Sequence, residues 1–288
     1  MPNNKLSLYN NNIDCDNWTE HWWLWTQKQR YRSQIWGAKC STGESLFDIE
    51  PYSGRCSYDT ALNSMECHNI LDKDFDILKE LTYMQQILNI SLHSVRMLTI
   101  DNCNLQKIQG NAFKGTNIEK IYLTDLQNLT LLDSNSLVDI ADYMKVFEIK
   151  GTNRLTFDET FVKLLSGLSL VESLTLSFGE RISIETKSFS KLKNLKSLRI
   201  DSAKHEILTT GSCVIFCFKQ LKHLSLANNK IYEIPYDAFR TDFSVYSLNL
   251  DMQNCSIDES KFHNKPFDDT YRPLLLNLSM PNGKCLPI

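Results

Sequence analysis

The sequence predicts an α/β solenoid, in which short parallel strands stack along a curved inner face and irregular or helical segments lie outside. The prediction depends on two observations. The stretch Leu221–Phe239 spaces its apolar residues like one unit of a repeat, and six further stretches follow the same frame. The starts of these seven stretches are 23, 26, 27, 24, 26 and 24 residues apart, within the interval typical of one repeat class. Because one such unit cannot bury its own apolar face, the copies must stack.

The clearest unit reads LKHLSLANNKIYEIPYDAF and begins at Leu221. Leu224 and Leu226 alternate on a short strand and point inward, since successive strand residues face opposite sides. Asn229 lies where the chain leaves the strand, and its amide can satisfy buried backbone groups there. Phe239 closes the unit on the outer side. This is the signature of a leucine-rich repeat, so the fold class is a leucine-rich-repeat solenoid.

The repeats are irregular, and Asn229 is the only residue that keeps the consensus asparagine. The other units begin at Val95, Ile118, Met144, Val171, Leu195 and Val245. The positions equivalent to Asn229 are Cys103, Leu126, Thr152, Gly179, Ala203 and Gln253. Cysteine replaces asparagine in this class of repeat, so we expect Cys103 to be a buried thiol. A last, degenerate strand is expected through Leu276 and Leu278.

Composition and repeats divide the chain into four parts. We expect a polar, asparagine-rich disordered tail at 1–14, a tryptophan- and cysteine-rich N-terminal cap at 15–92, repeats at 93–262 and a C-terminal cap at 263–288. Within the N-terminal cap, a hairpin should supply the first strand near Met65–Cys67. Apolar spacing predicts helix over 68–92.

Charge and hydropathy argue against nucleic-acid binding and against a membrane-spanning segment. The 288 residues carry a net charge of −3, which gives no general attraction to nucleic acid. No run of 18 apolar residues occurs, so the sequence predicts no membrane span.

Cysteines and glycosylation acceptors favour the secretory pathway. Cys15, Cys40, Cys56 and Cys67 precede the first repeat, as in a disulfide-tied cap, and a Cys56–Cys67 bond would hold the first strand. For the C-terminal cap we favour a bond between Cys255 and Cys285, although sequence does not fix connectivity. Asn-x-Ser/Thr acceptors occur at Asn17, Asn89, Asn128, Asn254 and Asn277. The opening MPNNKLSLYNNN does not resemble a signal peptide, so we expect an extracellular protein whose native first segment is absent from this sequence.

All five tryptophans fall within the 19 residues from Trp18 to Trp36. Trp18, Trp22 and Trp25 would share one face of a helix. That face could cap the apolar end of the solenoid, or it could bind a glycan or an apolar ligand, since tryptophan is enriched at binding hot spots. A helix lying on a membrane surface is a third interpretation, which Glu20 and the flanking cysteines disfavour.

Catalytic and metal-binding patterns are missing from the sequence. No nucleophile elbow, phosphate-binding loop or dinucleotide fingerprint occurs. The six histidines are scattered without ligand spacing. We therefore expect no enzyme, no cofactor and no metal site.

The residues that flank the inward positions should line the concave face of the sheet. The expected central column contains Thr99, Tyr122, Glu148, Thr175, Arg199, Ser225 and Asn249. This mixed polar surface suits a protein partner better than a nucleic acid. Large aromatic residues and arginine dominate binding hot spots, so the expected anchors are Tyr122, Glu148, Phe178, Arg199 and Tyr246. A merely solvated face is the alternative.

A family resemblance adds to this interpretation. The segments Cys56-Ser57-Tyr58-Asp59 and Met65-Glu66-Cys67, with the repeats that follow, resemble a secreted arthropod group of extracellular leucine-rich-repeat proteins. That group includes proteins similar to the non-catalytic subunit of the decapod shrimp luciferase complex. The resemblance covers about residues 56–262 and implies a non-catalytic binding or stabilising partner.

We therefore expect a secreted, non-catalytic protein that binds a protein partner through the concave face. One alternative is an innate recognition or adhesion module that holds a glycan or apolar ligand on the tryptophan cluster. Another is an intracellular scaffold with reduced cysteines.

Overall fold

The computed structural model describes residues 6–7, 12–13, 35–36, 39–40, 43, 45, 54–73, 75–86, 88–178, 183–185, 189, 191–201, 206–210, 220–231, 247–251, 253, 256–257 and 275–279. The chain forms two compact units. One unit contains residues 1–55 and 76–92, and the other contains residues 56–75 and 93–288.

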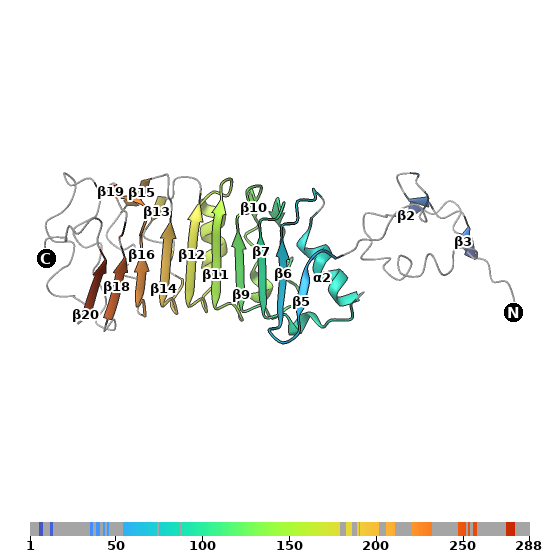
Figure 1. Ribbon diagram of the computed structural model, residues 1–288, viewed down its shortest axis with the longest axis horizontal. Coiled ribbons are helices and arrows are strands. Elements are labelled where there is room, and N and C mark those ends of the chain that lie inside the picture. The colour runs from blue at the N-terminus through green and yellow to red at the C-terminus, as the bar shows by residue number, and fades with distance from the viewer. Residues whose placement is uncertain are drawn as a thin grey trace. The chain divides into compact units, whose positions relative to one another are not determined.

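A ten-stranded sheet runs through the second unit (Figure 1). In spatial order its strands are β5 (Ser57–Asp59), β6 (Ser64–His68), β7 (Met97–Asp101), β9 (Lys120–Thr124), β11 (Val146–Thr152), β12 (Ser173–Phe178), β14 (Ser197–Asp201), β16 (His223–Ser225), β18 (Ser247–Asp251) and β20 (Leu275–Ser279). From β6 to β20 all neighbours are parallel, and β5 alone pairs antiparallel, with β6. The sequence-based prediction of a parallel-strand solenoid is confirmed.

Smaller sheets in the second unit follow the same stacking. A four-stranded parallel sheet contains β13 (Ser183–Glu185), β15 (Glu206–Thr210), β17 (Lys230–Ile231) and β19 (Ser256–Ile257). A two-stranded one pairs β8 (Lys107–Ile108) with β10 (Leu131–Leu132). The segments between strands also include α3 (Glu159–Ser166) and the 3₁₀ helices η1 (Leu92–Ser94) and η2 (Val138–Ile140).

The core of the second unit is a stack of apolar rows along the sheet. Leu98, Ile121, Phe147, Leu174 and Leu198 lie opposite one another on successive strands, and each is at most 2 % exposed. A second buried row runs two residues later, from Ile100 to Ile200. Full burial of such a side chain contributes about 1.5–3 kcal/mol, so these rows hold successive repeats together.

Left-handed residues turn the chain away after many strands of the large sheet. Asn69, Asn102, Asp125, Gly151 and Asn228 have φ of 56°, 49°, 52°, 65° and 63°. Asparagine, aspartate and glycine adopt this conformation more readily than other residues. Asn69, Asn102 and Asp125 directly follow β6, β7 and β9, whereas Gly151 lies near the end of β11 and Asn228 lies three residues after β16.

Helix α3 begins at a clear cap. The Asp158 side chain accepts a hydrogen bond from the Phe161 backbone N–H at 3.0 Å, which satisfies one of the amides left open at a helix start. The helix buries Phe161, Leu164 and Leu165.

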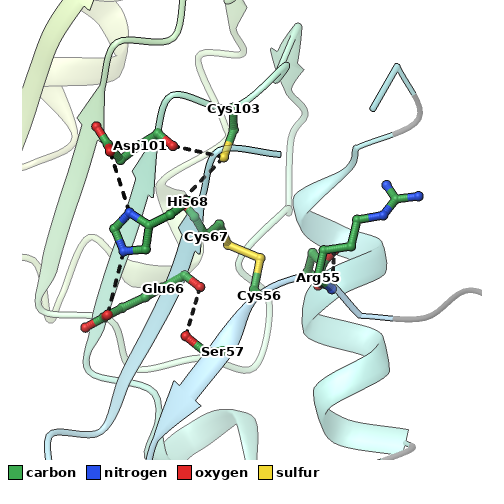
Figure 2. The surroundings of a disulfide bond; sticks show 9 residues. Arg55, Cys56, Ser57, Glu66, Cys67, His68, Asp101 and Cys103 are labelled. Carbon is green, nitrogen blue, oxygen red and sulfur yellow. Dashed lines mark hydrogen bonds and ion pairs between the residues drawn. A yellow bond between two sulfur atoms is a disulfide. The ribbon is translucent and has the colours of Figure 1, made fainter. Parts of the chain in front are cut away.

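The first strand of the array lies where the sequence predicted it, in β6. A disulfide joins Cys56 to Cys67, and Cys67 is fully buried. Figure 2 shows this bond linking the start of the hairpin to β6. The bond therefore holds the strand on which the repeats stack.

The predicted helix over 68–92 is too long. The helix observed is α2 (Ile77–Gln86), because Asn69 adopts a left-handed conformation and Asp76 caps the helix. The Asp76 side chain accepts hydrogen bonds from the backbone N–H groups of Leu78 and Lys79 at 2.8 and 3.2 Å.

Within the first unit, α2 holds the chain that leads to the disulfide. Glu80 is fully buried and both of its carboxylate oxygens accept the Arg55 backbone N–H, at 3.2 and 3.0 Å. Gly54 lies so close to the Tyr83 ring that no Cβ would fit there. These contacts fix the segment immediately before Cys56.

The described residues of the first unit also form four two-residue strands. β1 (Leu6–Ser7) pairs parallel with β3 (Ile35–Trp36), and β2 (Asn12–Ile13) pairs parallel with β4 (Lys39–Cys40). Within the described residues, no helix combines the length and apolar character needed to cross a bilayer. The boundaries expected for the tail, the caps and the repeats stay predictions.

Register differs from the expected column at one place. Ser225 pairs with Asp251, and His223 with Asn249, whereas the column expected from sequence placed Ser225 beside Asn249. The expected column was therefore wrong by two residues from β18 onward. A shift of two residues leaves every side chain on the same face of the sheet, so apolar alternation cannot distinguish the two registers.

Candidate functional site

The open face of the large sheet is the surface made by the strand residues that alternate with the buried rows. Its central row, in observed register, is Glu66, Thr99, Tyr122, Glu148, Thr175, Arg199, Ser225, Asp251 and Ser279. Three of the five residues expected to anchor a partner lie in this row: Tyr122, Glu148 and Arg199.

Tyr122 and Glu148 are direct neighbours on β9 and β11. Tyr122 is half-buried, and burial, with a further contribution from the negative charge of Glu148, raises the pKa of its phenol above the usual value of 10.0. Glu148 pairs with Lys150 at 2.7 Å between Oε1 and Nζ. The two side chains therefore present a neutral phenol beside a charge-paired carboxylate.

Arg199 lies two strands from Glu148, with Thr175 between them. Its guanidinium Nη2 is 3.3 Å from Asp201 Oδ2, and its side chain is 46 % exposed. Thr175, by contrast, is buried to 9 % exposure. Three small hydroxyl residues, Ser173, Thr175 and Ser177, occupy the open face of β12, so the larger side chains of β11 and β14 stand on either side of a lower strip.

The side chains of the other two expected anchors, Phe178 and Tyr246, stay predictions. Phe178 ends β12 and pairs with Thr152, beyond an irregularity that follows Ile149. Its side chain lies outside the part that the structure describes, and so does Tyr246. Trp18, Trp22 and Trp25, the predicted ligand surface, also lie outside the described residues.

The glycosylation acceptors fall in different surroundings. Asn89 is exposed. Asn128 is half-buried, and its Nδ2 donates a hydrogen bond to Asn104 Oδ1 at 2.8 Å. Asn277 lies in β20 opposite Asn249. Asn17 and Asn254 lie outside the described residues.

Among the other cysteine candidates, Cys40 is buried and disulfide-bonded, whereas Cys15, Cys255 and Cys285 lie outside the described residues. Cys103 is a buried thiol, as the repeat pattern predicted. Its Sγ donates to the carbonyl oxygens of Cys67 and Asp101 at 3.4 and 3.2 Å (Figure 2).

Asn229 performs the role that the repeat signature predicts. It is 2 % exposed, and its Nδ2 donates to the carbonyl oxygens of Ile200, Leu226 and Ala227 at 2.7, 2.7 and 3.1 Å. The amide thus links two successive units.

A histidine lies between two carboxylates at the end of the open face nearest the hairpin. His68 Nε2 is 3.7 Å from Glu66 Oε2, and its Nδ1 is 3.6 Å from Asp101 Oδ2 (Figure 2). Sequence reasoning did not bring these residues together, although all three occupy solvent-facing positions of adjacent strands. Across the described residues, no group of three or more His, Cys, Asp or Glu side chains is arranged to hold a metal ion.

A second feature that sequence reasoning missed is the edge row, formed by the residue just before each of the strands β7, β9, β11, β12, β14 and β16. Its members are Arg96, Glu119, Lys145, Glu172, Lys196 and Lys222. Each member after Arg96 donates its backbone N–H to the carbonyl of the preceding member, at 2.7 to 2.8 Å. The signal that could have found this row is the alternation of charge immediately before the strands from β7 to β14.

Ion pairs connect members of the edge row. Glu119 contacts Lys145 at 2.7 Å and Arg96 at 3.4 Å. The hydrogen bond from Lys145 is the main cause that lowers the pKa of Glu119 below its usual value, and the charges of Lys145 and Arg96 add to it. Lys196 contacts Glu172 at 2.9 Å.

Comparison with known proteins agrees with this repeat architecture. A family model described as the BspA type leucine rich repeat region matches residues 63–156 and 165–272, in six copies. Tsukushi of Gallus gallus is 29 % identical over 184 residues, which cover 59 % of this chain and 48 % of that protein. Tsukushi-A of Xenopus laevis is 30 % identical over 107 residues, which cover 37 % of this chain and 30 % of that protein. The chain thus spans less than half the length of these curated relatives.

Solved structures with a similar fold include human 5T4 (Wnt-activated inhibitory factor 1, trophoblast glycoprotein), with a TM-score of 0.48, 14 % identity and coverage of 74 % of each chain. They also include the TLR13–ssRNA13 complex, with a TM-score of 0.47, 17 % identity and coverage of 70 % of this chain and 27 % of that chain. Both TM-scores lie below 0.5, and neither likeness says more about this chain. The family model, however, matches well over half of the sequence, and the protein therefore belongs to the BspA-type leucine-rich-repeat family.

Proposed function

We propose that the protein is a non-catalytic, secreted binding protein that engages a protein partner through the open face of its large sheet. The observation that carries this proposal is the central row, which aligns Tyr122, Glu148 and Arg199 on neighbouring or next-neighbouring strands. Aromatic residues and arginine supply most of the binding energy at protein interfaces, and a rigid strand ladder holds them without a further cost of ordering loops. Phe178 and Tyr246 are proposed as additional anchors.

Two features support an extracellular location. Cys40 and the Cys56–Cys67 pair are disulfide-bonded, and disulfides persist mainly in oxidising compartments. The acceptor Asn89 is exposed. These features favour a secreted protein over an intracellular scaffold with reduced cysteines. Membership of the secreted arthropod group that the sequence resembles stays a prediction, as does ligand binding by the tryptophan cluster.

The acceptor Asn277 would limit where a partner can bind. It lies in β20, the end strand of the described sheet, and pairs with Asn249 in a row of the open face. A glycan on Asn277 would cover the open face at β18 and β20 and direct a partner to the middle strands, where Tyr122, Glu148 and Arg199 lie.

The test is a binding screen against a panel of secreted proteins and cell-surface ectodomains, followed by variants. Tyr122→Ala and Arg199→Glu should each weaken the binding of a partner found in this way by about tenfold or more. Lys114→Glu is the matched control, because Lys114 is exposed in the segment between β8 and β9 and the variant changes the net charge as Arg199→Glu does. A partner whose affinity is unchanged by both open-face variants would contradict the proposal.

A further inference from the structure

Charge alternates along most of the edge row. Arg96, Glu119, Lys145, Glu172 and Lys196 follow one another on successive strands, with cation and anion in turn. Each anion therefore lies between two cations on neighbouring rungs, and adjacent strands are only about 4.8 Å apart. Glu119 shows the effect, since its carboxylate contacts both Lys145 and Arg96.

The alternation ends at Lys222. The backbone N–H of Lys222 donates to the carbonyl of Lys196 at 2.8 Å, so the two lysines are neighbours in the edge row. Continued alternation of charge would place an acidic residue at the position of Lys222. Lys196 has Glu172 as its ion-pair partner. Lys222 is exposed, and within the described residues no acidic side chain pairs with it.

Two more lysines lie in the loop that leads into β14. Lys191 and Lys193 are exposed on either side of buried Leu192. The loop is fixed by the Asn194 side chain, whose Nδ2 donates to the Ser169 carbonyl at 3.0 Å. Leu192 and Leu195 are 1 % and 0 % exposed. These buried side chains anchor the loop backbone, which keeps Lys191 and Lys193 at the surface.

We propose that Lys191, Lys193, Lys196 and Lys222, here called the lysine edge, form a docking surface for an acidic segment of a partner protein. A carboxylate of the partner would contact both Lys196 and Lys222, as the Glu119 carboxylate contacts both Arg96 and Lys145. The inference rests on the proposed function, because it names the charge of the protein partner. It does not follow from the overall charge of the chain, which is −3 and by itself would repel an acidic partner.

The composition of the lysine edge favours a polypeptide over a continuous polyanion. Glu172 contributes a carboxylate that is 45 % exposed beside Lys196, and it would repel a nucleic-acid backbone or a sulfated glycan laid along the row. An acidic peptide can avoid this contact, because successive side chains of an extended peptide point to opposite faces and only alternate carboxylates lie against the row. Charges at the rim of an interface act mainly on the association rate and on partner choice.

The experiment measures the binding of a fluorescein-labelled hexaglutamate peptide to the full chain by fluorescence anisotropy, at low and at physiological ionic strength. Lys222→Glu and the double variant Lys191→Glu/Lys193→Glu should each weaken peptide binding by about tenfold, with a loss that shrinks as salt is added. Lys114→Glu, which changes the net charge as Lys222→Glu does, should change binding by less than about twofold. Urea unfolding of each variant verifies that the fold is intact.

Equal losses for Lys222→Glu and Lys114→Glu would overturn the proposal, because they would show a general effect of net charge. Displacement of the peptide by a heparin hexasaccharide at lower concentration than by unlabelled hexaglutamate would also overturn it, and would assign the lysine edge to a sulfated glycan.

The same variants separate this inference from the proposed function. If Tyr122→Ala abolishes binding of an identified partner and Lys222→Glu does not change it, the open-face function is supported and the proposed role of the lysine edge is wrong. If Lys222→Glu abolishes partner binding while Tyr122→Ala and Arg199→Glu bind normally, the proposed role of the lysine edge is supported and the open face is not the interface.

Discussion

Tyr122 on β9 and Glu148 on β11 occupy the same register position on adjacent strands, and the pKa of the Tyr122 phenol is raised by burial and by the negative charge of its neighbour. The relationship places a neutral hydroxyl beside a carboxylate in the centre of the open face. The phenolate absorbance of Tyr122 can therefore be used to test this arrangement in the protein without a partner.

Tyr122 should ionise at higher pH than an ordinary tyrosine. The stability that its neutral form contributes is fully present below the unfolded-state pKa and is lost as pH rises through the folded-state pKa. The measurement is the phenolate absorbance of the wild type minus that of Tyr122→Phe during a pH titration, because the chain has 11 tyrosines. In Glu148→Gln the pKa of Tyr122 should fall part of the way back, since burial remains. A Tyr122 that titrates at or below the usual value would contradict the register-based arrangement.

Glu119 should stabilise the stacked units at neutral pH through its contacts with Lys145 and Arg96. Because the pKa of Glu119 is lowered in the folded state, its contribution is present above the unfolded-state pKa and is lost as pH falls through the folded-state pKa. Glu119→Gln should reduce the free energy of unfolding by about 0.5–1 kcal/mol at neutral pH, and the difference from wild type should disappear in acid. Urea unfolding at both pH values measures this, with Asp142→Asn as an exposed control for the loss of one negative charge.

Much of the large sheet could be predicted from the spacing of apolar residues, because only the inward positions must be apolar in every unit. That spacing located β7, β9, β11, β12 and β14 and placed Tyr122, Glu148 and Arg199 in one row. It also identified the role of Asn229, since the consensus asparagine has a fixed place after the strand. These features share one cause, which is that burial constrains residue type.

The features that the sequence did not predict depend on constraints of other kinds. The register between β16 and β18 differs from expectation by two residues, and alternation with a period of two is unchanged by such a shift. The edge row escaped notice because its members are polar and solvent-exposed, so no hydrophobic periodicity marks them. The short extent of α2 depends on the cap at Asp76 rather than on apolar spacing, which continues on both sides of the helix.

Gly151 should resist substitution more than other glycines of the sheet unit. Its φ is 65°, and an added Cβ would collide with the Asp125 side chain. Gly151→Ala should reduce the free energy of unfolding by at least about 1–2 kcal/mol, the cost of a left-handed conformation for a residue with a Cβ. Gly110→Ala is the control, since the nearest atom to its added Cβ is 3.5 Å away, and it should change stability by no more than about 0.5 kcal/mol. Equal effects of the two variants would show that the left-handed conformation at Gly151, near the end of β11, is not formed.

Asn229 should be worth more to stability than an exposed asparagine, because its amide donates to carbonyls of two successive units. Asn229→Ala leaves these buried carbonyls without that donor, and an unsatisfied buried group costs about 1–3 kcal/mol. Asn229→Leu should be no better, even though Leu126 fills the equivalent position of another unit, since the surrounding carbonyls here are arranged for a donor.

The measurement for Asn229 is thermal and urea unfolding of both variants beside Asn153→Ala. Asn153 is exposed and donates to Gln127 on the surface, so its loss should change stability by no more than about 0.5 kcal/mol. A wild-type melting temperature in Asn229→Ala would mean that the amide does not couple the units. If Asn229→Leu alone were as stable as the wild type, apolar volume rather than hydrogen bonding would stabilise this position. The irregular residues Leu126 and Thr152 at the equivalent positions would then follow from packing.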